Sequence, residues 1–98
     1  MNLVLNHEGF ESNLIRRREH SLSGVQYLFR FENNYGASVV KHSYSYGNEE
    51  DLWELAVIIF DPENDSWYLT YTTDITEDVE GCLTDEDVRN LLQRIKEL

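Results

Sequence analysis

Hydrophobic and polar positions alternate along much of the middle of the chain, and this period of two predicts β-strands. From Val25 to Phe31 the apolar residues occupy every second position, which predicts a strand with one buried face. The segment 33–36 (Asn-Asn-Tyr-Gly) contains residues that tolerate a positive φ, so we expect a tight turn there. Alternation resumes from Ala37 to Tyr46 and predicts the second strand of a hairpin.

Two further strands are expected after a polar loop. The run 52–60 (LWELAVIIF) is apolar on both faces, which predicts a central strand. A turn is expected at 61–65, where Pro62 has no N–H to donate to a ladder. The run 67–72 (WYLTYT) is rich in aromatic and β-branched residues and predicts the next strand. The short connections favour an antiparallel meander.

The period changes to that of a helix near residue 84. Thr84 is a suitable N-cap, and acidic residues follow it in the first turn, where the helix dipole favours them. Apolar residues then recur with the spacing of a single helical stripe. They are Val88, Leu91, Leu92, Ile95 and Leu98. We expect a helix over 84–98 with this stripe on one face of the sheet.

These elements predict one α+β domain over residues 1–98, an antiparallel β-sheet meander of four to five strands with one C-terminal α-helix packed on one face. A length of 98 residues fits a single domain. Alternation at Leu3 and Leu5, and the pair Leu14-Ile15, predict one or two additional strands at the sheet edge. The residues expected in or beside the core are Phe29, Leu55, Val57, Ile59, Leu69, Leu91, Leu92 and Ile95.

The chain is strongly acidic, and its charge is unevenly distributed. Eight Lys and Arg oppose nineteen Asp and Glu, for a net charge of −11. Residues 1–48 have a net charge of +1, whereas residues 49–98 contain fifteen acidic and three basic residues, a net charge of −12. This balance argues against direct nucleic-acid binding and against attraction to anionic membranes, because both depend on Lys and Arg. No apolar run approaches the roughly 20 residues of a membrane helix, so we expect a cytoplasmic protein.

The sequence contains no pattern that favours an enzyme. Cys82 is the strongest nucleophile candidate, but the acidic residues around it oppose thiolate formation, so we expect it to serve as a small buried hydrophobic residue. His7, His20 and His42 are far apart and have no metal-ligand spacing. We therefore expect no catalytic residue and no cofactor.

A calcium loop is the closest match to a metal motif. Asp61, Glu63 and Asp65 occupy positions 1, 3 and 5 of such a loop. Ser66 stands where the loop requires Gly, and Thr72 stands where it requires a bidentate Glu. A solvated acidic hairpin fits these residues better, and no metal site is expected.

The segment 61–87 is the most informative feature, because it contains ten acidic residues and no Lys or Arg. Mutual repulsion among these carboxylates is relieved when some of them are neutralised. Three uses remain open: a solvated face that promotes solubility, a surface that imitates phosphates and docks into the nucleic-acid groove of a protein, and another kind of acidic interface. The candidate contact residues are Asp61, Glu63, Asp65, Asp74, Glu77, Asp78, Glu80, Asp85 and Glu86.

Two smaller features add candidates. Tyr44 and Tyr46 lie next to the polar loop 47–51 in the sequence, where aromatic side chains fit either a partner contact or core packing.

The basic cluster 16–18 (Arg-Arg-Arg) is too small to bind nucleic acid in so acidic a chain. This cluster is suited to pairing with the acidic half of the same chain or with that of a second copy. Pairing with a second copy would form a homodimer, which we keep as an alternative to a monomer.

The runs 35–47 (YGASVVKHSYSYG) and 52–57 (LWELAV) resemble small uncharacterised acidic bacteriophage proteins, as do 83–88 (LTDEDV) and the helix residues that follow. The similarity extends from about Phe10 onward. It implies a context and not a reaction, because such proteins often bind and inhibit host or defence proteins, sometimes as DNA mimics.

The acidic segment and this resemblance together lead us to expect a non-enzymatic protein-binding module. Its partner would be a host or defence protein that binds nucleic acid, in the host-cell cytoplasm. The alternative is a small structural or accessory phage protein that self-associates through its sheet edges.

Overall fold

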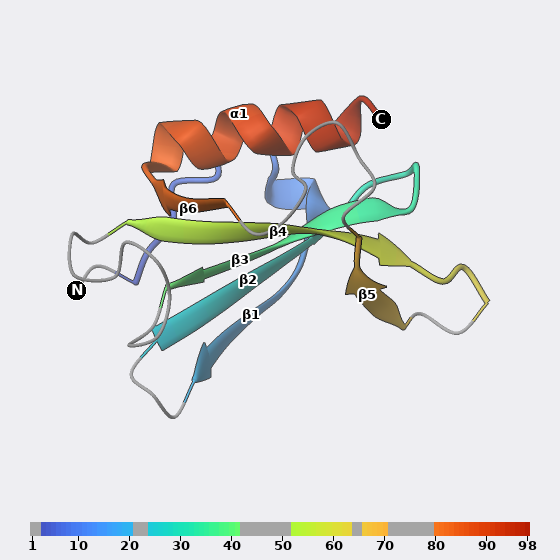
Figure 1. Cartoon of the computed structure of the whole chain (residues 1–98), viewed down its shortest axis with the longest axis horizontal. Helices are drawn as coiled ribbons and strands as arrows, with labels where there is room; N and C mark the ends of the chain where they lie inside the picture. The colour runs from blue at the N-terminus through green and yellow to red at the C-terminus, as the bar shows by residue number, and fades with distance from the viewer. Residues whose placement is uncertain (1–2, 21–23, 42–51, 64–65, 71–79) are drawn as a thin grey trace.

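The computed structural model describes residues 3–20, 24–41, 52–63, 66–70 and 80–98, except the side chains of His20 and Glu80. The elements, in chain order, are η1 (Glu11–Asn13), β1 (Leu14–His20), β2 (Gly24–Arg30), β3 (Tyr35–Lys41), β4 (Trp53–Phe60), β5 (Trp67–Leu69), β6 (Glu80–Leu83) and α1 (Asp85–Lys96). Figure 1 shows the sheet with α1 lying across one of its faces, so the expected α+β class is confirmed. No helix within these ranges is long and apolar enough to cross a membrane.

The strands form one antiparallel sheet in the order β1-β2-β3-β4-β5, as the predicted meander requires, and β6 joins it beside β4. β6 pairs with the beginning of β4 and β5 with its end, on the edge that β3 does not use. The central position predicted for β4 is therefore confirmed. β6 was not predicted, because its sequence Glu-Gly-Cys-Leu contains one large apolar residue and no alternation.

The main core lies between the sheet and α1, on what we call the helix face. Register aligns Phe29, Ala37 and Val57 across β2, β3 and β4, and all three are at most 1% exposed. α1 contributes three fully buried side chains from its apolar stripe, Val88, Leu92 and Ile95. The removal of this apolar surface from water is the main source of the free energy that holds the helix on the sheet.

Most of the expected core residues are confirmed as buried: Phe29, Leu55, Val57, Leu92 and Ile95, with Leu91 partly buried beside them. The expectation for Leu69 is wrong. It lies on the three-residue edge strand β5 and is 40% exposed. Ile59 is only half-buried, one residue from the end of β4. Leu98, from the helix stripe, lies beyond the end of α1 and is exposed.

The turn between β2 and β3 differs in detail from the prediction. Asn34 adopts the positive φ (68°), whereas Gly36 already belongs to β3. Glycine is required at position 36 by packing, because a Cβ there would overlap the Phe29 carbonyl oxygen and lie 2.8 Å from the Phe60 ring. Glycine is therefore needed at position 36, but the reason is the close approach of neighbouring strands and not a positive φ in the turn.

Both ends of α1 are capped by side chains. The N-cap predicted at Thr84 is confirmed, and it forms a capping box with Asp87: Asp87 N donates to Thr84 Oγ1 (3.1 Å), and Thr84 N donates to Asp87 Oδ2 (3.0 Å). At the other end, the Asn33 side-chain amide donates to the Ile95 carbonyl (2.9 Å), and also to the carbonyls of two residues that follow it. Carbonyls in the last turn of a helix lack their usual partner four residues on, so Asn33 ties the β2–β3 turn to the helix end.

Residues 3–10 cross the helix face beside β2 and do not form the strand that alternation at Leu3 and Leu5 suggested. Leu5 and Phe10 are buried there. The Tyr27 hydroxyl links this segment to the sheet, accepting from Leu5 N (3.1 Å) and donating to the Leu3 carbonyl (3.2 Å). Of the one or two N-terminal strands expected, the described residues form one, β1.

Candidate interaction surfaces

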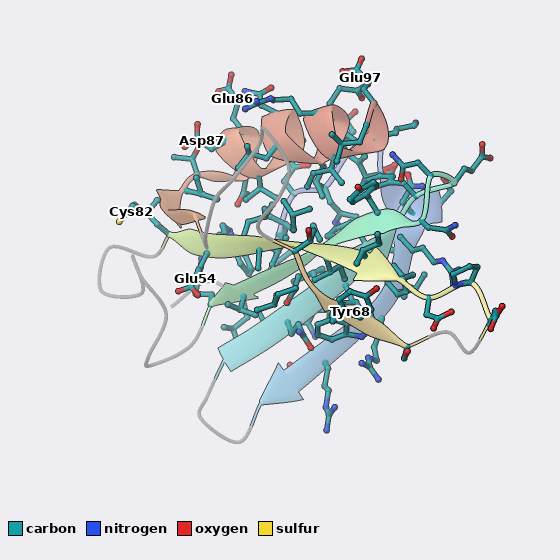
Figure 2. All side chains as sticks on the ribbon, turned by 45° about the vertical axis from the view of Figure 1, so that its right-hand side comes forward. Glu54, Tyr68, Cys82, Glu86, Asp87 and Glu97 are labelled. Carbon is teal, nitrogen blue, oxygen red and sulfur yellow. The ribbon has the colours of Figure 1, made fainter. Side chains whose placement is uncertain are left out.

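The start of α1 carries the acidic residues that are best defined. The Asp85 carboxylate accepts from Trp53 Nε1 (2.8 Å) and from the Asn6 backbone N–H (3.3 Å). Asp87 belongs to the capping box, so both side chains hold the helix start in place. Glu86 is exposed and makes no hydrogen bond with any described residue, and Figure 2 shows it pointing away from the sheet.

The other described acidic residues of the 61–87 segment lie at the far end of β4. Asp61 and Glu63 follow its last residue, and Asp61 Oδ1 accepts from Glu63 N (2.9 Å) in the turn. The start of α1 follows β6, which pairs with the first residue of β4. β4 is eight residues long, which at about 3.3 Å per residue separates its two ends by about 23 Å. Figure 1 shows the two sites at opposite ends of the molecule, so the structure does not bring these acids together.

Six of the expected contact residues lie outside the described residues: Tyr44, Tyr46, Asp65, Asp74, Glu77 and Asp78. Glu80 is described only as the first residue of β6. Within the described ranges the one salt bridge joins Arg17 and Glu19 (3.4 Å), which are neighbours in β1. No described acidic residue of segment 61–87 is therefore neutralised by an ion pair in these ranges.

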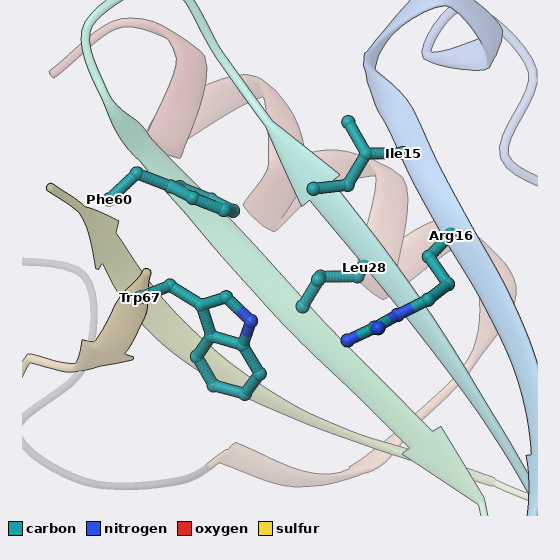
Figure 3. Close-up of a pocket in the computed structure, with 5 residues that line it drawn as sticks. All are labelled: Ile15, Arg16, Leu28, Phe60 and Trp67. Carbon is teal, nitrogen blue, oxygen red and sulfur yellow. The ribbon is translucent and has the colours of Figure 1, made fainter. Parts of the chain in front are cut away.

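The face of the sheet opposite α1, which we call the outer face, carries a second apolar cluster. Leu28, Ile58 and Phe60 are at most 3% exposed, and Trp67 packs against them partly buried. Three of these four side chains, with Ile15 and Arg16 from β1, line a pocket of about 190 Å³. In Figure 3 the Arg16 guanidinium and the Trp67 indole extend toward each other with Leu28 between them. The pocket thus combines an apolar lining with one cationic group.

Sequence reasoning missed this pocket because its residues come from four strands. Leu28 stands between Gln26 and Arg30 among the polar positions of β2, which hid its burial. The available signal was the apolar run of β4, because a strand that is apolar on both faces predicts packing on both faces. That rule could have located Ile58 and Phe60, but not the partners that β1 and β5 supply.

The three consecutive arginines of β1 divide between the two faces. Register places Arg17 beside Tyr27 on the helix face, and Arg16 and Arg18 beside Leu28 and Gln26 on the outer face. Arg17 Nε donates to the Tyr27 hydroxyl (3.0 Å), and this hydrogen bond is the main cause that raises the pKa of Arg17. The side chains of Arg16 and Arg18 make no hydrogen bond or ion pair with any described residue. The outer face is therefore basic along β1.

The candidate nucleophile does not occupy the buried place expected for it. Cys82 is exposed and has a φ of 59°, in an edge strand whose pairing with β4 is irregular. This backbone conformation directs the thiol outward (Figure 2), while Leu83 packs partly buried against the core. Backbone geometry, which the sequence pattern did not reveal, overturns the expectation of a buried cysteine.

The described histidine side chain has a packing role. His7 Nδ1 lies 3.0 Å from the Leu5 carbonyl, and the ring packs against Tyr27 and Phe29 with centroids 5.7 and 5.8 Å away. In the part of the chain that the structure describes, no three His, Cys, Asp or Glu side chains gather as metal ligands. His42 and Asp65, which the sequence singled out, lie outside that part.

Comparisons with known proteins assign neither a family nor a function to this chain. Searches of protein-family models, of curated proteins and of solved structures find no significant match to the chain. What the protein does has to be inferred from its own charge and surface chemistry.

Proposed function

We propose that this chain is a non-enzymatic protein-binding module whose acidic surface docks onto the nucleic-acid-binding surface of a host or defence protein. The observation that carries the proposal is the uncompensated charge of segment 61–87, which has ten acidic residues and no basic one. Its described carboxylates form no ion pair within the described ranges. Those carboxylates that do not hold the helix start, such as Glu63 and Glu86, are available to the Lys and Arg side chains of another protein, which are the groups that otherwise contact phosphates.

The hydrogen bonds around α1 narrow the choice of contact residues. Asp85 and Asp87 hold the helix start, so Glu86 is the contact that we assign on α1. Asp74, Glu77, Asp78 and Glu80 precede the helix in the sequence, and we assign them as contacts as well. Asp61 and Glu63 are the described contacts at the other end of β4, and Asp65 follows them in the sequence. The separation of about 23 Å between the two ends of β4 corresponds to about seven base-pair steps along the axis of a DNA duplex.

The class of partner follows from charge and from resemblance. A net charge of −11 opposes nucleic acid itself as the ligand, because its phosphates would be repelled. A basic nucleic-acid groove is attracted by the same charge. The resemblance to small acidic bacteriophage proteins supports a host or defence protein as the target, in the host-cell cytoplasm, and supports inhibition as the outcome.

Self-association through sheet edges is the alternative role, and the edge that β1 forms argues against it. β1 is the terminal strand of the sheet and carries Arg16, Arg17 and Arg18 in succession. Charged residues on an edge strand oppose pairing with another copy, because like charges would stack against each other. We therefore favour the binding module.

The proposal is tested by capturing proteins from a host lysate on the immobilised chain. We expect a nucleic-acid-binding protein that is retained at about 50 mM salt and released by about 200 mM, since salt screens charge over a Debye length of about 8–10 Å. The variant D74N/E77Q/D78N/E80Q should lose this protein. The matched control E8Q/E19Q/E32Q/E97Q removes the same number of charges from exposed positions outside segment 61–87 and should keep it.

The kinetics of binding distinguish charge steering from a short-range contact. Replacing peripheral carboxylates is expected to slow association more than it accelerates dissociation. If the partner binds both variants as tightly as the wild type at every salt concentration, the acidic segment is plain solvated surface. The region around Tyr44 and Tyr46 would then become the leading candidate interface.

A further inference from the structure

The outer face has exposed apolar surface that the acidic docking surface does not use. Ile15 is 51% exposed and Leu69 is 40% exposed, and register places Leu69 beside Ile58 on this face. Ile15 lines the pocket of about 190 Å³, and the Trp67 indole is another of its walls. Small-molecule sites usually measure about 300–1,000 Å³, so this pocket is too small for a whole cofactor and suits a single large side chain.

Positive charge adjoins this apolar surface. Arg16 lines the pocket itself, and Arg18 lies on the same face two residues along β1. Arg30 stacks on the Phe60 ring, with its guanidinium carbon 4.7 Å from the ring centroid. Arg16 and Arg18 form no hydrogen bond or ion pair with any described residue, so their donors can meet an anion from outside.

We propose that the outer face docks an acidic peptide segment of a partner protein. One aromatic or leucine-sized side chain of the peptide enters the pocket between Leu28 and Trp67, and carboxylates on either side of it pair with Arg16 and Arg18. Interfaces commonly use this arrangement, in which a buried apolar anchor supplies affinity and flanking charge pairs fix its orientation. Arginine is suited to the task because its planar fork binds a carboxylate through two hydrogen bonds.

A nucleic-acid strand fits the same face less well. Base binding on an open sheet depends on aromatic rings whose faces are free for stacking. Phe60 is 3% exposed, packs over Gly36 and has the Arg30 guanidinium on its ring, so it offers no free face. A polyanion would also meet the net charge of −11, whereas a peptide with a few carboxylates depends on short-range contacts.

The charges on this face also fix which way the peptide lies. Asp61 follows Phe60 at the other end of the pocket. Its carboxylate would repel an acidic peptide, so the carboxylates of the peptide should lie along β1 and its apolar anchor should point toward β5.

The probe for this proposal is the peptide acetyl-Gly-Asp-Glu-Phe-Asp-Glu-Gly-amide, titrated while the Trp67 indole N–H signal is followed by NMR. Trp53 is 1% exposed in the core, so its indole signal should stay in place and serve as an internal reference. We expect saturable movement of the Trp67 signal. Replacing the Phe of the peptide by Ala, or its acids by Asn and Gln, should weaken binding about tenfold, because each change removes one half of the contact.

Two variants test the arginines against a matched control. R16Q and R18Q should each weaken the peptide about fivefold to tenfold, as expected for a lost charge-assisted hydrogen bond. R94Q removes the same charge from an exposed position on α1, on the other side of the sheet, and should leave binding unchanged. An NMR spectrum of the backbone amides of each variant checks that the fold is intact. If R16Q does not fold, the proposal is tested with R18Q alone.

Three results would overturn the proposal. One is no movement of the Trp67 signal at about 5 mM peptide, a concentration that detects even millimolar affinity. Another is an equal loss of binding in R94Q and R16Q, which would show a nonspecific effect of charge. The third is tighter binding of oligothymidylate than of the peptide, which would assign the face to nucleic acid.

Discussion

At the scale of single residues, Trp53 explains why one expected contact residue is structural. Its indole is 1% exposed, and Lys41 Nζ lies 4.2 Å from the ring centroid. A buried indole N–H needs an acceptor, and Asp85 supplies it. The carboxylate that sequence reasoning assigned to a partner is therefore already engaged within the fold.

This assignment predicts different effects for two neighbouring acidic residues. Replacing Asp85 by Ala leaves the Trp53 N–H without its acceptor, so the free energy of unfolding should fall by about 1–3 kcal/mol. Replacing the exposed Glu86 by Ala should change it by less than about 0.5 kcal/mol. Urea denaturation of both variants measures the difference, and equal effects would show that the Trp53–Asp85 hydrogen bond contributes nothing.

Glu11 provides a pH-dependent prediction at the same scale. Hydrogen bonds from its own backbone N–H and from Gly9 N, which lies 2.9 Å from Oε1 and 3.0 Å from Oε2, lower the pKa of this carboxyl in the folded chain. Its contribution to stability is therefore present above the unfolded pKa and is lost as the pH falls through the lower folded pKa. NMR titration should find a lower midpoint for Glu11 in the native chain than in the same chain in urea. An equal or higher native midpoint would contradict these hydrogen bonds.

At the scale of elements, the packing of α1 on the sheet is the most accessible test of the fold. Leu92 is fully buried, so replacing it by Ala should lower the free energy of unfolding by about 2–5 kcal/mol, through lost transfer energy and the cavity left behind. Leu98 lies beyond the helix and is 45% exposed, and the same replacement there should have little effect. A loss below about 0.5 kcal/mol for Leu92 in denaturant unfolding would mean that α1 is not packed as described.

Elements with a regular pattern were predictable from the sequence. β2 alternates with a period of two, β4 is apolar on both faces and α1 has helical spacing, because each of them has at least one face that must be buried against another element. The N-cap at Thr84 was predictable as well, since capping depends on neighbours within one turn.

Features that depend on contacts between distant segments were not predictable. Asn33 caps the end of a helix 62 residues away, and no local pattern marks that role. The sequence predicts a buried place for Leu69 because aromatic and β-branched residues surround it, yet it lies on a short edge strand that leaves it exposed. The outer pocket needed the register of four strands, and a shift of one residue in any of them would turn its lining to the other face.

At the scale of the whole molecule, opposite chemistries occupy opposite sides of the sheet. The outer face has an apolar pocket and the side chains of Arg16 and Arg18, which make no hydrogen bond or ion pair with any described residue, whereas the start of α1 carries exposed carboxylates. Charges on the two sides are screened from each other by salt over about 8–10 Å. A chain with a net charge of −11 can therefore present an acidic surface to one partner and a basic pocket to another.

We propose that the acidic surface of this chain occupies the place of nucleic acid on its partner. The most direct measurement is the affinity of the purified partner for this chain while a duplex that the partner binds is added in increasing amounts. Competition predicts that the apparent Kd rises linearly with the concentration of free duplex, from its value without duplex, and that no complex of all three forms. A Kd that stays constant, with chain, partner and duplex migrating together, would contradict the claim.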